Sequence, residues 1–288
     1  MPIGETNIDS SFAQVIRVLL LAKPKEGKTT TALTASAQCP TEFPCKQPVE
    51  LQDTYIISFE DPANAFLAPQ AYGLRFGNNI YDMSQLRDIV NNEPSAHAAN
   101  ILYQKTMADM RNKVKERMAD KALLVVDGLS TFDSMLETVA RKTTSTDKAF
   151  WGVVKDGLTE LMDFVAKLKK TTVITAHVRA EATFRGDKND TTAKALFDAS
   201  NEARSIGEGE LRAELTGKGG SEWNKYIDAA WPVCKERVNG KDVVKILPQG
   251  GSQYQGGGRF PMLNPAGEVA HLGTIFKKIR AGMAQGVK

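Results

Sequence analysis

Residues 15–31 constrain the fold of this chain more than any other stretch. They read VIRVLLLAKPKEGKTTT: a run of Val, Ile and Leu, a short loop with Lys, Pro and Gly, and then a helical segment that opens at Lys28. A buried strand, such a loop and a helix in this order predict a cradle for nucleotide phosphates, built from backbone N–H groups and the positive end of the helix. The residues expected to line this cradle are Ala22, Lys23, Pro24, Lys25, Glu26, Gly27, Lys28, Thr29 and Thr30.

Within this loop we expect Lys28 to reach the terminal phosphates and the Thr29 hydroxyl to bind Mg²⁺. The usual pattern is Gly-x-x-x-x-Gly-Lys-[Ser/Thr], and this chain has Ala22 in place of the first glycine. Because alanine resists positive φ, we expect the loop to open with slightly different backbone angles and still to bind phosphate. The alternative is a chance Gly-Lys-Thr before a surface helix, which the flanking strand and helix disfavour.

Length and composition favour one large α/β domain with an extension. The chain has 288 residues, 42% hydrophobic and 25% charged, and a net charge of +3 that permits contact with nucleic acid without arguing for it. We place the domain at 1–250, with a flexible N-terminus at 1–11, and a Gly-rich connector and basic tail at 251–288. Cys39, Cys45 and Cys234 are expected to be free thiols. With no signal peptide and no apolar stretch that spans a bilayer, we expect a cytoplasmic protein without membrane contact.

Apolar runs and helical segments alternate along the chain, which predicts an α/β fold with a mainly parallel sheet flanked by helices. The predicted strands are 15–21, 54–59, 122–128 and 171–177, and the predicted helices are 28–38, most of 80–118, 131–142 and 148–170. Asn239-Gly240, between 231–237 and 241–247, predicts a hairpin that extends the sheet with antiparallel strands. A Gly-rich connector at 250–258 and a short helix at 272–282 follow.

Three side chains follow or end predicted strands and would face the phosphates. Asp127 would hold Mg²⁺ beside Thr29, mostly through water, unless it only caps the next turn. Glu60 is preferred over Asp61 as the group that orients or deprotonates an attacking water, since Asp61 could equally be a turn residue before Pro62. His177 could sense a γ-phosphate, or could be a structural histidine at a strand end.

The combination of AKPKEGKTT, FED, VVD and VITAH resembles the RecA-like branch of P-loop ATPases, in particular small phage-encoded RecA-core (AAA-type) ATPases linked to single-strand annealing and recombination. The resemblance covers residues 12–250. It implies a RecA-like P-loop NTPase core that uses ATP and Mg²⁺, with Glu60 as catalytic base, Asp127 and Thr29 at the metal, and His177 as the polar sensor. If the chain is phage-encoded, its compartment is the cytoplasm of a host bacterium.

The resemblance also implies self-association into a ring or filament, with a basic finger supplied by the neighbouring subunit. The candidates for this finger are Arg237, Arg259, Lys218 and Lys225, and Arg259 is the first choice. In the RecA-like family, DNA contacts come from loops after the Asp-bearing strand and after the sensor strand. The matching residues here are Arg141, Lys142, Arg179, Phe184, Arg185 and Lys188. Basic side chains would neutralise DNA phosphates and Phe184 could stack on a base, although Asp187 and Asp190 equally suit a solvated polar loop.

The resemblance therefore implies an ATP-hydrolysing protein that acts with single-stranded DNA in phage-type recombination, repair or replication, alongside other recombination or replication proteins. Two alternatives stay open. The Gly-rich connector and tail would suit a nucleotide-gated assembly or packaging factor. The same phosphate loop could also serve a small-molecule phosphotransferase, with Arg179, Arg185 and Arg204 as its lid, although Glu60 and His177 suit attack by water better.

Overall fold

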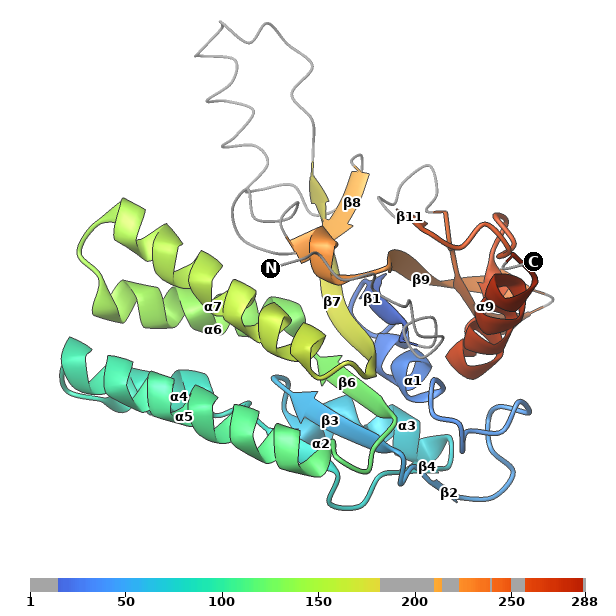
Figure 1. Ribbon diagram of the computed structural model, residues 1–288, viewed down its shortest axis with the longest axis horizontal. Helices are drawn as coiled ribbons and strands as arrows, with labels where there is room; N and C mark the ends of the chain where they lie inside the picture. The colour runs from blue at the N-terminus through green and yellow to red at the C-terminus, as the bar shows by residue number, and fades with distance from the viewer. Residues whose placement is uncertain (1–14, 182–209, 214–222, 239, 250–256, 287–288) are drawn as a thin grey trace, which may run out of the picture.

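The computed structural model describes residues 15–181, 210–213, 223–238, 240–249 and 257–286. In this part of the chain one large sheet runs through the molecule, with helices on both of its faces (Figure 1). Its strands, in spatial order, are β12 (Glu268–Val269), β10 (Lys241–Ile246), β9 (Ala229–Val238), β1 (Arg17–Ala22), β7 (Thr171–Glu181), β6 (Leu123–Asp127), β3 (Thr54–Ser58) and β5 (Ile80–Asp82). Two further strands join this sheet, β11 (Gly257–Gly258) beside β9 and β8 (Glu210–Ala213) beside β7. The strands β2 (Val49–Glu50) and β4 (Leu74–Arg75) pair separately.

The strand pairs from β9 through β1, β7, β6 and β3 to β5 are all parallel. Beyond β9, strands β10 and β12 extend the sheet in antiparallel fashion. The predicted α/β fold is thereby confirmed, with a mainly parallel sheet flanked by helices and an antiparallel hairpin extension. Within this hairpin β9 is antiparallel to β10, while it pairs in parallel with β1. Strand β1 is buried and needs a hydrogen-bonding partner along each edge, and β9 provides the second one.

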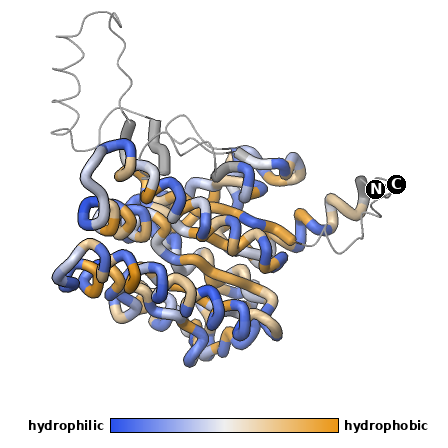
Figure 2. The backbone as a smooth tube through the Cα atoms, turned by 60° about the vertical axis from the view of Figure 1, so that its left-hand side comes forward, coloured by the Kyte–Doolittle hydropathy of each residue, from blue (hydrophilic) through white to orange (hydrophobic). Residues whose placement is uncertain are grey.

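Side chains of β1 alternate between two buried layers, as expected for a strand covered on both faces. Leu19 and Leu21 pack on one side, and Val18 and Leu20 on the other. The helices of the first layer are α4 (Leu86–Asn92), α5 (Ala96–Arg117), α6 (Leu129–Thr143) and α7 (Asp147–Lys167), and those of the second are α1 (Lys28–Leu33), α2 (Pro62–Ala65), α3 (Leu67–Ala71) and α9 (Leu272–Gly286). Figure 2 shows hydrophobic strands between helices whose colour alternates from turn to turn.

The predicted elements agree with the structure in kind and differ mainly at their ends. The first helix ends at Leu33, earlier than predicted, and β7 continues past His177 to Glu181. Residues 80–118 were predicted to be mostly helical, but they open with β5 and then divide into α4 and α5. Pro94 separates these two helices because it lacks an N–H for the helical ladder, and the Ser95 side chain then caps α5 by accepting the Ala98 N–H at 3.1 Å.

The C-terminal helix α9 packs into the core, and it is longer than the helix predicted there. Leu272, Phe276 and Ile279 are buried in the same cluster as Val18 of β1. The Leu272 N–H also donates to Thr34 Oγ1 at 2.9 Å, which ties the start of α9 to the end of α1. The predicted boundary near residue 250 stays a prediction, but α9 shares its core with the strand that leads into the phosphate loop.

We expect Phe276→Ala to lower the free energy of unfolding by about 3–5 kcal/mol, because it removes a ring that is 2% exposed and leaves a cavity. Chemical denaturation followed by circular dichroism measures this change. The matched control is Lys277→Ala, at the neighbouring exposed position of α9, which should stay close to the wild-type value. Equal stability of the two variants would show that α9 adds little to the core.

Two smaller expectations concern thiols and membranes. All three cysteines are free thiols, as predicted. Among the described helices, none combines the length and the apolar character that crossing a bilayer would require.

Candidate functional site

The predicted phosphate loop connects β1 directly to α1. Its left-handed backbone positions are Lys25, with a φ of 67°, and Gly27, with a φ of 87°. Ala22 is instead the last residue of β1, in extended conformation. The usual pattern has a glycine at the position of Ala22, but this loop needs no positive φ there. Gly27, the glycine that the loop retains, does adopt a positive φ.

The loop is braced from within and beside it. The Glu26 carboxylate accepts the Lys23 N–H at 3.0 Å, and the Thr31 N–H donates to Gly27 O at 2.9 Å. Ala22 pairs with His177 in the register of β1 and β7, which sets the histidine next to the loop.

The parallel strands bring the other predicted residues to the same edge of the sheet. Ser58 pairs with Asp127 in the register of β3 and β6, and Glu60 follows two residues later. Because the carboxyl ends of parallel strands meet at one edge, residues far apart in sequence converge here.

Lys28, Glu60 and His177 form one contact group. Lys28 Nζ lies 3.4 Å from Glu60 Oε1, and His177 Nε2 lies 3.1 Å from the same oxygen. Lys28 Nζ and His177 Nε2 are 3.5 Å apart. The contact with His177, helped by the positive charge of Lys28, holds the pKa of the Glu60 carboxyl below its usual range in spite of its burial. Glu60 is thus an ionised carboxylate at neutral pH.

Asp127 is fully buried and is held by two hydroxyls. Thr29 Oγ1 donates to Asp127 Oδ1 at 2.9 Å, and Thr175 Oγ1 donates to the same oxygen at 2.7 Å. Burial, followed by the negative charge of Glu60, raises the pKa of the Asp127 carboxyl. Its second oxygen, Oδ2, is buried and has no hydrogen-bond partner among the described residues. A buried carboxylate in this condition favours a nearby positive charge.

This donor set fits a hydrated Mg²⁺. This cation prefers oxygen ligands and keeps several waters or phosphate oxygens in its coordination shell. Thr29 and Asp127 present neighbouring oxygens, and Asp127 Oδ2 has no hydrogen-bond partner among the described residues. Within the described ranges no group of three or more His, Cys, Asp or Glu side chains could hold a metal ion. A cation here would therefore need phosphate oxygens and water to complete its coordination.

Glu60 is free to face Lys28 because of two neighbouring residues, Asp61 and Gly128. Asp61 caps α2, where its carboxylate accepts the Ala63 N–H at 3.0 Å and the Asn64 amide at 2.7 Å. Gly128 has a φ of 90°, and a Cβ there would lie 2.8 Å from Cγ of Glu60. Glycine at this position therefore makes room for the Glu60 side chain.

Sequence reasoning missed two hydroxyl residues of the site. Thr175 accepts the Gly128 N–H at 2.9 Å while it donates to Asp127, and Ser130 accepts the His177 N–H at 3.0 Å. Thr175 could have been found, since residues two apart in a strand share a face and His177 was already a candidate.

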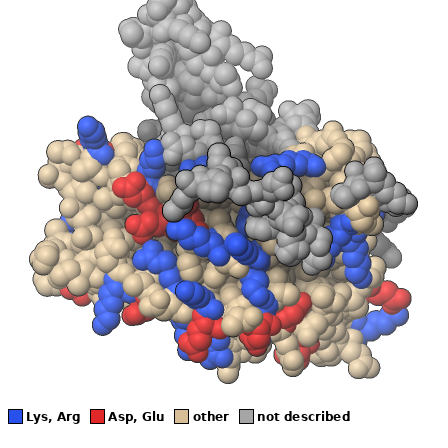
Figure 3. Space-filling model, in the orientation of Figure 1, with Lys and Arg blue, Asp and Glu red and all other residues tan. Residues whose placement is uncertain are grey.

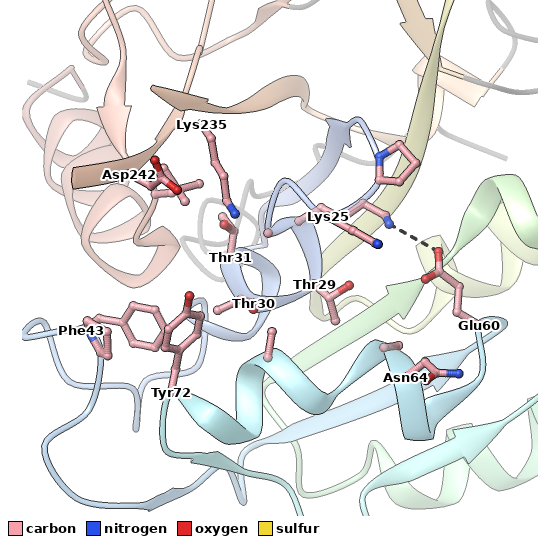
Figure 4. Close-up of a pocket in the computed structure, with 18 of the residues that line it drawn as sticks. Lys25, Thr29, Thr30, Thr31, Phe43, Glu60, Asn64, Tyr72, Lys235 and Asp242 are labelled. Carbon is pink, nitrogen blue, oxygen red and sulfur yellow. Dashed lines mark ion pairs between the residues drawn. The ribbon is translucent and has the colours of Figure 1, made fainter. Parts of the chain in front are cut away.

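The site opens into a cavity of about 690 Å³. The polar end of this cavity is lined by Lys28, Thr29, Glu60 and His177. From there the cavity continues past Thr30 and Thr31 (Figure 4). The residues that line the far end and were not predicted include Phe43, Tyr72, Lys235, Asp242 and Val244. Phe43 and Tyr72 meet because the Cys45 N–H donates to Tyr72 O at 3.1 Å and β2 pairs with β4, contacts that no local pattern encodes.

Of the candidate finger residues that the structure describes, none lines this cavity. Arg259 is exposed and lines a separate hollow of about 390 Å³ with Trp231 and Phe260. Arg237 is exposed on β9, Lys225 lies 4.8 Å from the ring centre of Tyr226, and Lys218 falls outside the described residues. A finger acts from a neighbouring subunit, so its identity stays a prediction.

Among the predicted DNA-contact residues, the structure describes the side chains of Arg141 and Lys142, and neither lines the cavity. Arg141 and Lys142 were expected in a loop after β6, but α6 begins at once and places them in its last turn, where Arg141 pairs with Glu137 at 3.3 Å and Lys142 donates to Asn91 O at 2.6 Å. Arg179 lies in β7. Phe184, Arg185 and Lys188, and also Arg204 of the alternative lid, fall outside the described residues.

No protein-family model and no curated protein matches this sequence. Among solved structures, the crystal structure of a KaiC-like protein from the hyperthermophilic archaeon Pyrococcus horikoshii is similar, with a TM-score of 0.37 and 12% sequence identity. The match covers 81% of this chain and 77% of that one. This likeness is too distant to assign residues or activity, so functional inference depends on the geometry of the site itself.

Proposed function

We propose that this chain binds ATP with Mg²⁺ in the cavity beside the phosphate loop and hydrolyses its terminal phosphate bond. The observation that carries this proposal is the convergence of Lys28, Glu60 and His177 within 3.5 Å of one another, next to the buried Thr29–Asp127 pair. A cation for phosphate, an ionised carboxylate for water and a pair of oxygens for a divalent metal are the parts that phosphoryl transfer to water requires.

Each residue of the site would have a separate role in hydrolysis. Lys28 is buried, with an exposed fraction of 6%, and would neutralise charge on the outer phosphates. Glu60 would orient the attacking water and accept its proton, and its lowered pKa keeps it in the basic form. The His177 ring positions the Glu60 carboxylate, while Thr175 and Thr29 fix Asp127. Mg²⁺, when bound, supplies further neutralisation of the phosphate oxygens.

The position of Glu60 favours hydrolysis over transfer to a small molecule. A phosphotransferase needs its acceptor where water would otherwise attack, and that end of the cavity is lined by Glu60, Lys28 and His177. A nucleotide-gated assembly factor would use the same site with slow turnover, and it stays the alternative.

Phosphate release from ATP with and without Mg²⁺ tests the proposal, together with calorimetric binding of Mg-ATP to the whole chain. We expect binding and a turnover that stops when EDTA removes the metal. A chain that binds no nucleoside triphosphate would overturn the proposal.

We further propose single-stranded DNA as the macromolecular partner, in recombination, repair or replication, and self-association around the nucleotide. The support is the resemblance of the motifs. On the face shown in Figure 3, basic side chains gather across the middle with acidic ones beside them, so the surface charge alone is not decisive. DNA action predicts ATP turnover that single-stranded DNA accelerates, with a steep loss at higher salt. Indifference of turnover to all nucleic acids would reject this part, and sizing with a non-hydrolysable ATP analogue, with and without DNA, tests assembly.

A further inference from the structure

The cavity beside the phosphate loop has two chemically different halves. The half around Lys28, Thr29 and Glu60 carries the polar groups described above. The half beyond Thr31 is lined by aromatic and aliphatic side chains, with charged groups among them (Figure 4). A triphosphate alone would fill only the first half, so the ligand suited to the whole cavity joins a polyphosphate to a group with apolar faces.

Two aromatic rings form one wall of the second half. The ring centres of Phe43 and Tyr72 are 5.5 Å apart in an edge-to-face arrangement with an interplanar angle of 67°. Tyr72 lines the cavity and is 42% exposed. The Cys45 N–H, bonded to Tyr72 O, fixes the two loops against each other. A preformed aromatic wall of this kind offers a stacking surface for a planar ring.

The antiparallel extension of the sheet forms the opposite wall. Val244 lies over the phosphate loop, since a Cβ on Gly27 would be 3.9 Å from Val244 Cγ2. Lys235 pairs directly with Val244 in the register of β9 and β10, and Asp242 lies two residues from Val244, so the three share one face of the sheet. The Ala270 N–H donates to Val244 O at 3.2 Å, which holds β10 in place. An apolar side chain next to a carboxylate and an ammonium group matches a ring with apolar faces and polar edges.

We propose that this half of the cavity is a nucleobase subsite. The base lies against Phe43 and Tyr72 with Val244 opposite, and its edge faces Asp242 and Lys235. Adenine satisfies both charged groups, because its amino group donates to a carboxylate and its ring nitrogens accept from an ammonium group. This inference rests on the proposed function, since the base is placed here by a triphosphate held at Lys28.

The test compares Mg-ATP with Mg-tripolyphosphate, which lacks the base and the sugar. We expect Tyr72→Ala to weaken ATP binding about tenfold, as the loss of one stacking partner does, and to leave tripolyphosphate binding unchanged. Tyr72→Phe should bind ATP like the wild type. In turnover, Tyr72→Ala should raise KM for ATP with kcat nearly constant, because the phosphate end is untouched.

The matched control is Trp151→Ala, which removes another exposed aromatic side chain outside the cavity and should change neither ligand. If Tyr72→Ala and Phe43→Ala bind ATP as the wild type does, or weaken both ligands equally, the subsite is wrong while the proposed hydrolysis stands. If the wild type binds tripolyphosphate as tightly as ATP, the base contributes nothing and the subsite is likewise wrong. If the wild type binds neither, the proposed function and this inference fail together.

Discussion

Lys28→Ala is expected to reduce ATP hydrolysis by about 10²–10³-fold or more, because it removes the ammonium group that would stabilise charge on the transferred phosphate. Binding of Mg-ATP should weaken as well, since a hydrogen bond to a charged group contributes about 1.5–3 kcal/mol. Lys28 Nζ contacts Glu60 and His177 in the polar half of the cavity, and no other lysine of the described residues has these two partners. Phosphate release and calorimetry on the purified variant measure both effects.

The control for this variant is Lys105→Ala, at an exposed position on α5 that does not line the cavity. It has the same change in net charge and should hydrolyse ATP at the wild-type rate. Circular dichroism of both variants checks that the fold is kept. Normal turnover in Lys28→Ala would mean that the loop does not hold the reacting phosphate, and the proposed function would then lose its main support.

Much of the polar site could be predicted because its residues follow local patterns. Glu60, Asp127 and His177 each end or directly follow an apolar run, and Lys28 follows a short loop. Once the strands are known to be parallel, their carboxyl ends must meet, and the pairing of Ala22 with His177 is one instance. Local pattern and parallel topology together predict which residues converge at this edge.

The rest of the site depends on contacts between distant segments. Phe43 and Tyr72 lie in separate loops whose meeting is set by the pairing of β2 and β4, and those strands are only two residues long. The Asn239-Gly240 signal predicts a local hairpin but says nothing of the second edge of β1, where β9 pairs. The helix α9 was expected in a tail for the same reason, because burial of Phe276 depends on which surface it meets.

Glu60→Gln should lower kcat by about 10²–10⁴-fold and leave ATP affinity equal to that of the wild type or higher. The amide has nearly the shape of the carboxylate, but it cannot accept a proton from the attacking water. It also removes the negative charge 3.4 Å from Lys28 Nζ, so the ammonium group is left freer to bind phosphate. Single-turnover phosphate release separates the chemical step from binding, which calorimetry measures on the same variant.

Asp61→Asn is the matched control, because it neutralises the adjacent carboxylate with the same change of atoms. Asp61 caps α2, and asparagine is also a good N-cap, so this variant should keep both its fold and its rate of hydrolysis. The opposite pattern, with Glu60→Gln active and Asp61→Asn inactive, would assign the base to Asp61. Since only Glu60 contacts both Lys28 and His177, the geometry favours a loss confined to the Glu60 variant.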